Sequence, residues 1–298
     1  MALNLTILQI RSLRLLFFFF WISSGAVSAT TFRNGESLGT VSREISHASG
    51  LAASRKHHGV LYTHNNGVDH RPFIYAINAS TASLIARLRV YPANNHDWED
   101  IAVGPCGKAS CIYIEENPNV VYRVEEPDFI YSDQILPLKD KVQTNWQHDH
   151  SNTLMVDPSG LVYVVAAHHG GTGKIGRINP GDWGRTNVNI DTDIKLHVPT
   201  HNVHHHNADP VSGDISKDGR QILILMKDHV YYWNVINGDI LQTLGSSHGR
   251  ETLPLKRRNS EAIAWDSSGR NYYTVERGES VPLYLYQRED TSPQNIFG

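Results

Sequence analysis

The feature that most constrains the fold of this 298-residue chain is an internal repeat with a period of about 50 residues. Each segment has a short apolar strand, a turn, a second strand, a polar loop and a third strand, with tyrosine in most of the later strands. The equivalent positions near the start of the first strand are Ser49, Glu99, Asn152, Val211 and Glu261. Their separations are 50, 53, 59 and 50 residues, so no gap has room for another repeat.

The turns between the first two strands of the repeats favour antiparallel hairpins. Asp157–Gly160, Lys217–Gly219 and Asp266–Gly269 each place a glycine in such a turn, and glycine supplies the positive φ that tight hairpins need. A fourth strand is expected at Leu84–Leu88 in the first repeat and at Ile240–Leu244 in the fourth.

The last repeat has no fourth strand of its own. The segment Leu38–Ile45 precedes the first repeat and is expected to supply that strand and close a ring. Closure removes the exposed sheet edges of an open array. The sequence therefore predicts an all-β fold, a five-bladed β-propeller with four antiparallel strands per blade, over residues 30–298 as a single domain; six blades is the alternative.

The N-terminal segment predicts export from the cell. Arg11 and Arg14 precede the apolar run Leu15–Ile22, and small residues follow as far as Ala29. This order is typical of a secretory signal peptide, here residues 1–29. The apolar run is shorter than the roughly 20 residues that span a bilayer, which argues against the alternative of a signal anchor. We therefore expect a secreted, extracellular protein without membrane insertion.

Two further features agree with an extracellular protein. Asn78 begins an Asn-Ala-Ser sequon and is an expected glycosylation site. Cys106 and Cys111, the 2 cysteines of the chain, are expected to form a disulfide in an oxidising compartment. With 27 basic and 30 acidic residues and a net charge of -3, the composition gives no reason to expect a nucleic-acid partner.

Histidine is unusually frequent in this sequence, with 17 residues. In a propeller, the loops between blades and the loops joining second to third strands lie on one face, and most of the histidines fall in these loops. The simple interpretation is that long loops collect polar residues. The alternative is a His-rich binding face, on which imidazole acts as acid, base or metal ligand. The expected binding residues are His64, Asn65, His96, Lys256, Arg257 and Arg258.

Two metal sites are conceivable. Oxygen ligands near the starts of the innermost strands would suit Ca²⁺ or another divalent metal. That candidate set is Glu99, Asp100, Asn152, Asp214 and Glu261. Its alternative is a water-filled channel with a polar lining. A second candidate is the His-rich stretch His197–His206, for which the alternative is an exposed loop with adventitious metal affinity.

A proton-transfer set is the catalytic alternative. His148 and His150 precede the third repeat, and His168 and His169 follow its second strand, so the two pairs should approach each other on one face. Asp97 is one carboxylate that could orient an imidazole. Together with nearby positive charge, such a set would suit β-elimination on a uronic-acid polysaccharide. The alternative is a solvated polar rim.

The repeats resemble a group of secreted bacterial and invertebrate β-propeller proteins, most of them without assigned activity. The resemblance rests on Ala48–Ser54, Thr63–Asn65, Trp98–Pro105 and Glu261–Asp266, and Trp-Glu-Asp-Ile-Ala is its most specific element. This chain has Ile114–Asn119 where the resemblance implies an acidic Gly-Asp-x-Gly-Asp-Asn loop. More distantly, the architecture is similar to gluconolactonase-type propellers, which hold a divalent ion, and to propeller-fold polysaccharide lyases.

The expected function is extracellular binding through the His-rich face, with a glycan, an extracellular or shell-type matrix, or a metal as the ligand. The alternative is an enzyme, either a polysaccharide lyase acting on uronic-acid glycans or a divalent-metal-dependent hydrolase or lactonase. Fold alone does not decide between these functions.

Overall fold

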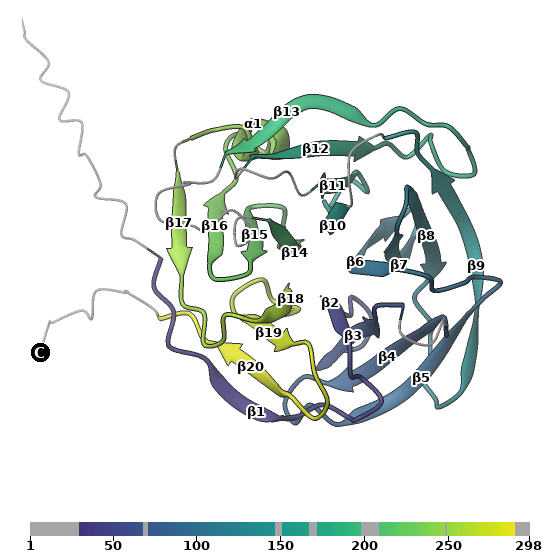
Figure 1. Cartoon of the computed structure of the whole chain (residues 1–298), viewed down its shortest axis with the longest axis vertical. Helices are drawn as coiled ribbons and strands as arrows, with labels where there is room; N and C mark the ends of the chain where they lie inside the picture. The colour runs from purple at the N-terminus through teal and green to yellow at the C-terminus, as the bar shows by residue number, and fades with distance from the viewer. Residues whose placement is uncertain are drawn as a thin grey trace, which may run out of the picture.

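The computed structural model describes residues 30–67, 71–146, 151–166, 172–197, 209–247 and 249–289. Its strands surround a central axis in a propeller-like arrangement (Figure 1). The predicted signal peptide, residues 1–29, lies outside the described residues. Within the described ranges, no helix is long and apolar enough to cross a membrane.

The first part of the ring is an eight-stranded sheet made of two antiparallel four-stranded units. The first unit is β2 (Ala48–Ala53), β3 (Val60–Asn65), β4 (Phe73–Asn78) and β5 (Leu84–Tyr91). The second unit is β6 (Trp98–Cys106), β7 (Ala109–Glu116), β8 (Val120–Glu125) and β9 (Gln134–Gln143). The outer strands β5 and β9 pair in parallel, from Leu88 with Gln134 to Tyr91 with Pro137, and this pairing joins the two units.

Three separate four-stranded antiparallel sheets complete the ring. The first is β10 (Ser151–Val156), β11 (Val162–Ala166), β12 (Thr172–Ile178) and β13 (Asp191–His197). The next is β14 (Pro210–Ile215), β15 (Gln221–Met226), β16 (Val230–Asn234) and β17 (Arg250–Leu253). The last is β18 (Ser260–Trp265), β19 (Tyr272–Glu276), β20 (Pro282–Tyr286) and β1 (Glu36–Thr40).

The innermost strands follow the register that the sequence repeat predicts. β2, β6, β10, β14 and β18 contact one another in turn around the axis, and β18 returns to β2. The five positions identified as equivalent in the sequence are each the second residue of their strand. The sequence repeat therefore predicted the equivalent positions of the five innermost strands to the residue.

The N-terminal strand closes the last sheet, as predicted. β1 pairs antiparallel with β20, from Glu36 opposite Leu285 to Thr40 opposite Pro282. The described chain therefore joins its N-terminal strand to its last repeat, and the outer edge of β20 is covered.

One predicted strand is a helix. Ile240–Leu244 forms α1, and the fourth strand of that unit is β17. The reason is local: the side chain of Asp239 accepts a hydrogen bond from the backbone N–H of Gln242 at 2.9 Å, which caps the helix N-terminus. Burial of Ile240 and Leu244 against the neighbouring sheet holds the helix in place.

Large aromatic side chains fill the spaces between neighbouring sheets. Trp98, Trp233, Trp265, Tyr62 and Tyr113 are among the largest fully buried side chains. Such side chains bury a large apolar area each. Because this packing immobilises the sheets, the polar residues at the two ends of the axis are held on a fixed framework.

Candidate functional site

The four histidines of the predicted proton-transfer set, His148, His150, His168 and His169, lie outside the described residues. The same holds for four histidines of the His-rich stretch, His201, His204, His205 and His206. Their roles stay predictions.

The sequence analysis predicted Asp100 as a metal ligand at the channel mouth. In the structure its side chain instead links neighbouring strands. The side chain is fully buried. Its Oδ2 accepts hydrogen bonds from the backbone N–H groups of Leu154 at 2.9 Å and Gly213 at 3.2 Å. Its Oδ1 accepts from the N–H of Ile101 at 2.9 Å and the hydroxyl of Ser212 at 3.1 Å. One carboxyl therefore connects the innermost strands β6, β10 and β14.

Asp214 is a second correction to the expected metal set. It is buried, and its Oδ2 accepts a hydrogen bond from the backbone N–H of Trp265 at 2.8 Å. Burial raises its pKa to about 6. Across the described ranges, no group of three or more His, Cys, Asp or Glu side chains is placed to hold a metal ion.

Polar side chains do converge where the innermost strands begin. Asn117, in the β7–β8 connection, donates from Nδ2 to Glu99 Oε1 at 3.1 Å and to Asp97 Oδ2 at 3.4 Å. The hydroxyl of Ser151, the first residue of β10, donates a hydrogen bond to Glu115 Oε1. We call Asp97, Glu99, Glu115 and Asn117 the mouth cluster.

The backbone of β6 is irregular where it enters the mouth cluster. The pairing of β6 with β7 shifts register between Trp98 and Ile101. The other four innermost strands have a similar shift near their first residues. Bulges interrupt the regular alternation of side chains, and because this one recurs in all five innermost strands it is a feature of the repeat.

Two carboxyl groups of the mouth cluster, those of Glu99 and Glu115, have raised pKa values. Burial is the main cause that raises the pKa of Glu99 to about 8, and the negative charges of Asp97 and Glu115 add to the effect. Burial also raises the pKa of Glu115 to about 7. Among the described residues, no group forms a hydrogen bond with Glu115 Oε2, although this atom is inaccessible to solvent.

Asn152 and Glu261 lie at the same end of the axis, because each is the second residue of its innermost strand. Asn152 Oδ1 is inaccessible and has no hydrogen-bond partner within the described part of the chain. Burial raises the pKa of Glu261. Asn152 and Glu261 belong to the predicted metal set, and the structure places both at the end of the axis that carries the mouth cluster.

The structure places His64 inside the molecule and not on the rim that we expected. Its ring is fully buried and lies edge-on to Trp98 with 5.7 Å between ring centroids. Burial lowers its pKa to about 4. His64 is therefore a neutral core side chain at physiological pH.

Asn65 also has a structural position, because both ends of its side chain are used. Its Oδ1 accepts from the N–H of His47 at 3.0 Å, and its Nδ2 donates to the carbonyl of Glu44 at 2.7 Å. His96, in contrast, is exposed just before β6. Of these three expected binding residues, only His96 is accessible to a ligand.

The three basic residues of the expected binding set lie in the β17–β18 connection. Lys256, Arg257 and Arg258 are all exposed. Arg257 Nε donates to the hydroxyl of Tyr284 at 3.4 Å. Since this connection leads into Glu261, the three cations occupy the end of the axis where the innermost strands begin.

Glu115 is the functional candidate that the sequence analysis missed. It lies near the end of β7. A usable signal existed: Glu115, Glu116 and Asn117 fall where the second strand enters the loop to the third, and that loop shares a face with the start of the first strand. A sequence search limited to first strands could not find it.

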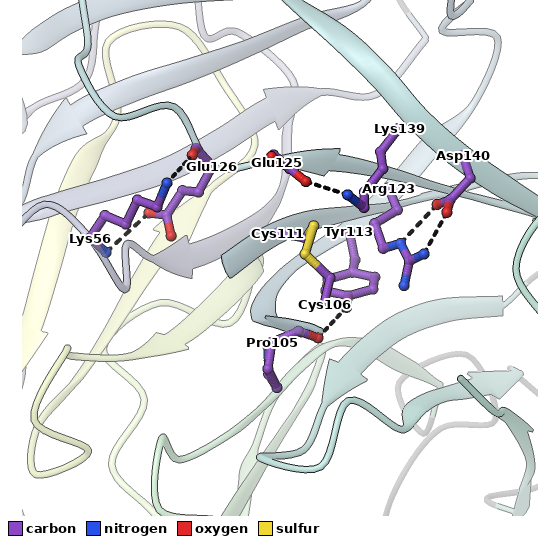
Figure 2. The surroundings of a disulfide bond; sticks show 10 residues. All are labelled: Lys56, Pro105, Cys106, Cys111, Tyr113, Arg123, Glu125, Glu126, Lys139 and Asp140. Atoms are coloured by element: carbon purple, nitrogen blue, oxygen red, sulfur yellow. Dashed lines mark hydrogen bonds and ion pairs between the residues drawn. A yellow bond between two sulfur atoms is a disulfide. The ribbon is translucent and has the colours of Figure 1, made fainter. Parts of the chain in front are cut away.

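The opposite end of the axis carries the predicted disulfide. Cys106 and Cys111 are joined, with 5.7 Å between their Cα atoms, across the β6–β7 hairpin. Figure 2 shows that Tyr113 lies beneath this hairpin, and its hydroxyl donates to the carbonyl of Pro105 at 2.6 Å. The disulfide and the hydrogen bond from Tyr113 therefore both hold the hairpin in place.

Comparison with known proteins identifies only the fold. No family model matches this chain, and no curated protein matches it in sequence. Its structure is similar to the PQQ-bound form of an aldose sugar dehydrogenase from Streptomyces coelicolor, with a TM-score of 0.53, 10% identity, and coverage of 88% of this chain and 99% of that one. At this identity, the similarity supports a propeller-like architecture and nothing finer.

Two further structures have lower similarity. Chaetomium thermophilum Raptor has a TM-score of 0.47 and 11% identity over 88% of this chain, which spans only 29% of that chain. Hydrazine synthase from Kuenenia stuttgartiensis has a TM-score of 0.49 and 10% identity, over 92% of this chain and 100% of that chain.

Proposed function

We propose that this protein is a secreted, five-bladed propeller that binds an extracellular glycan at the mouth cluster. The blade count takes each half of the eight-stranded sheet as one blade and adds the three four-stranded sheets. The disulfide supports an oxidising, extracellular location. The observation that carries the function is the convergence of Asp97, Glu99 and Asn117, joined by hydrogen bonds, with Glu115 close by at one end of the axis.

The chemistry of the mouth cluster favours a ligand rich in hydroxyl groups. A carboxyl whose pKa is about 8, as for Glu99, carries a proton at neutral pH and both donates and accepts hydrogen bonds. Asp97 and Glu99 are half-buried and are therefore the members of the cluster that a ligand can reach, whereas Glu115 and Asn117 are buried. Sugar hydroxyls also donate and accept, so they match this set without a counter-charge.

A binding experiment with the mature chain tests this proposal. A panel of neutral and uronic-acid oligosaccharides is titrated calorimetrically, and the tightest-bound member is then titrated against Glu99→Ala. We expect the affinity to fall at least tenfold, or about 1.4 kcal/mol. The matched control is Glu125→Ala, an exposed residue on β8, which should bind as the unchanged protein does. Equal binding by Glu99→Ala would remove the mouth cluster from the function.

A divalent metal stays a proposal that rests only on the oxygen-rich residue types at the mouth, because the described residues do not assemble a ligand set. Elemental analysis after exhaustive dialysis tests it. About one retained ion per chain would support the cofactor, and a metal-free protein with unchanged thermal stability would remove it.

The second candidate function is an enzyme, a lyase acting on uronic-acid glycans. Its specific support is that the pKa values of Glu99 and Glu115, about 8 and about 7, lie where proton transfer is efficient at neutral pH. The propeller of an aldose sugar dehydrogenase is compatible with an enzyme at the level of fold alone. Ultraviolet absorbance from an unsaturated product, lost in Glu99→Ala, would favour the lyase; bound but unchanged polysaccharide would favour the binding protein.

A further inference from the structure

A pocket of about 350 Å³ opens at the end of the axis opposite to the mouth cluster. It lies among the turns that join the first two strands of four repeat units. Three of its lining residues are basic: Arg55 from the β2–β3 turn, Lys108 from the β6–β7 hairpin and Lys217 from the β14–β15 turn. The pocket therefore gathers cations from three parts of the chain that are distant in sequence.

These three cations have no carboxylate partner in the described part of the chain. No Asp or Glu oxygen there lies within 4.0 Å of their side-chain nitrogens. Arg55 donates from Nε to the carbonyl of Val103 at 3.4 Å, which directs its side chain along the end of β6. The positive charges of Arg55, Lys108 and Lys217 are therefore not paired within the described part of the chain and can bind an anionic ligand.

The one acidic residue that lines the pocket is committed to its own turn. Asp157 Oδ1 accepts from the N–H groups of Ser159 at 2.8 Å and Leu161 at 3.0 Å. Its Oδ2 accepts from the hydroxyl of Tyr163 at 3.2 Å. Asp214 also interacts electrostatically with Arg55, and with a pKa of about 6 it is mostly ionised at neutral pH, but it is buried and does not line the pocket. The lining side chains therefore carry three positive charges against one negative charge.

The backbone around the cations is held firmly before any ligand binds. The buried carboxyl of Glu126 accepts from the N–H groups of Arg55 at 3.2 Å and Lys56 at 3.4 Å. The disulfide between Cys106 and Cys111 fastens the hairpin that carries Lys108. Figure 2 shows Glu126 in the surroundings of the disulfide. A preformed site loses less entropy when it binds a ligand.

We propose that this pocket, the anion pocket, binds the phosphoryl group of a phosphate monoester. Three cations and one anion leave a net charge of about +2, which a dianionic tetrahedral oxyanion would balance. Guanidinium and ammonium groups are the side chains that recognise such oxygens. The volume of about 350 Å³ leaves room for a carrier the size of a monosaccharide beside Pro105, Val156 and Pro158. The proposal is independent of glycan binding at the other end.

Calorimetric titration of the mature chain tests the proposal with four probes: glucose 6-phosphate, glucose 6-sulfate, inorganic phosphate and glucose. We expect glucose 6-phosphate to bind at least tenfold more tightly than glucose 6-sulfate, and glucose not to bind. Equal affinity for inorganic phosphate and glucose 6-phosphate would identify free phosphate as the source of the oxyanion and still support the anion pocket. No preference for glucose 6-phosphate over glucose would overturn the proposal.

Two variants locate the binding. Lys108→Gln and Lys217→Gln remove single charges from exposed side chains, and each should weaken glucose 6-phosphate binding at least tenfold. The matched control is Lys195→Gln, an exposed lysine on the outer strand β13, which should bind normally. Equal loss in the control, or no loss in both pocket variants, would contradict the proposed site.

Discussion

The proton on Glu99 gives a prediction at the scale of the single residue. Its folded pKa of about 8 lies above the ordinary value of 4.5, so the folded protein binds more protons than the unfolded chain between these values. Stability is therefore lost as the pH rises from about 4.5 to about 8, and the loss is constant above that. Glu99→Gln removes the ionisable group and should raise the melting temperature at pH 8.5 but not at pH 4.

Thermal unfolding of both proteins from pH 4 to pH 9 measures this effect. Glu125→Gln is the control, because that residue is almost fully exposed and the ion pair with Lys139 lowers its pKa. A Glu99→Gln protein with the same pH profile as the unchanged chain would show that the carboxyl is ionised in the fold and that the mouth cluster lacks the proposed proton.

The irregular start of β6 explains why the prediction for Asp100 failed. The pairing of β6 with β7 shifts register between Trp98 and Ile101, so regular strand alternation does not say where Glu99 and Asp100 point. Asp100 meets the backbone of β10 and β14. His64 is buried because its ring, on β3, packs edge-on against Trp98 at the start of β6. Composition and repeat period carry no information about such pairings.

At the scale of the element, the repeat could be predicted and the exceptions to it could not. The inner strands follow from the spacing of apolar segments, and β1 follows from the missing fourth strand of the last repeat. Ile240–Leu244 is a short apolar run whose period does not separate strand from helix. Asp239 was the available signal, because an aspartate before such a run is a favourable helix cap.

The β6–β7 hairpin gives the prediction that belongs to this scale. Its disulfide closes a short loop, and replacing both Cys106 and Cys111 by Ser should lower the unfolding free energy by about 2 kcal/mol. Because Lys108 lies inside that loop, the same change should weaken glucose 6-phosphate binding. Chemical denaturation and calorimetry measure the two effects.

Mild reduction provides the matched control for the hairpin. A reductant should weaken phosphate binding in the unchanged protein and have no effect in the double Ser variant, since the chain has 2 cysteines. Unchanged stability and unchanged affinity in the double variant would mean that the disulfide neither stabilises the fold nor arranges the anion pocket.

At the scale of the whole molecule, Asp100 makes the ring one cooperative unit. Its carboxyl links β6 to β10 and β14, and Ser212, which donates to it, accepts from the backbone N–H of Ile263 on β18 at 3.2 Å. On β2, a Cβ at Gly50 would lie 2.7 Å from Asp100 Oδ1, so only glycine leaves room for this carboxyl. The tie therefore involves all five innermost strands.

Asp100→Ala should lower the unfolding free energy by about 3 kcal/mol or more, because several buried donors lose their acceptor and each costs about 1–3 kcal/mol. The control Asp128→Ala breaks an exposed ion pair with Lys56 and should cost less than about 1 kcal/mol. Chemical denaturation measures both. Similar losses in the two variants would contradict the role of Asp100 as a tie.

The central claim is that the end of the axis at which the innermost strands begin holds the ligand. An experimental structure of the mature protein with the tightest-bound oligosaccharide of the panel tests it most directly. We predict ligand density within hydrogen-bond distance of Asp97 and Glu99, the two half-buried members of the mouth cluster. Well-defined ligand density elsewhere on the molecule, with no density at these residues, would contradict the claim.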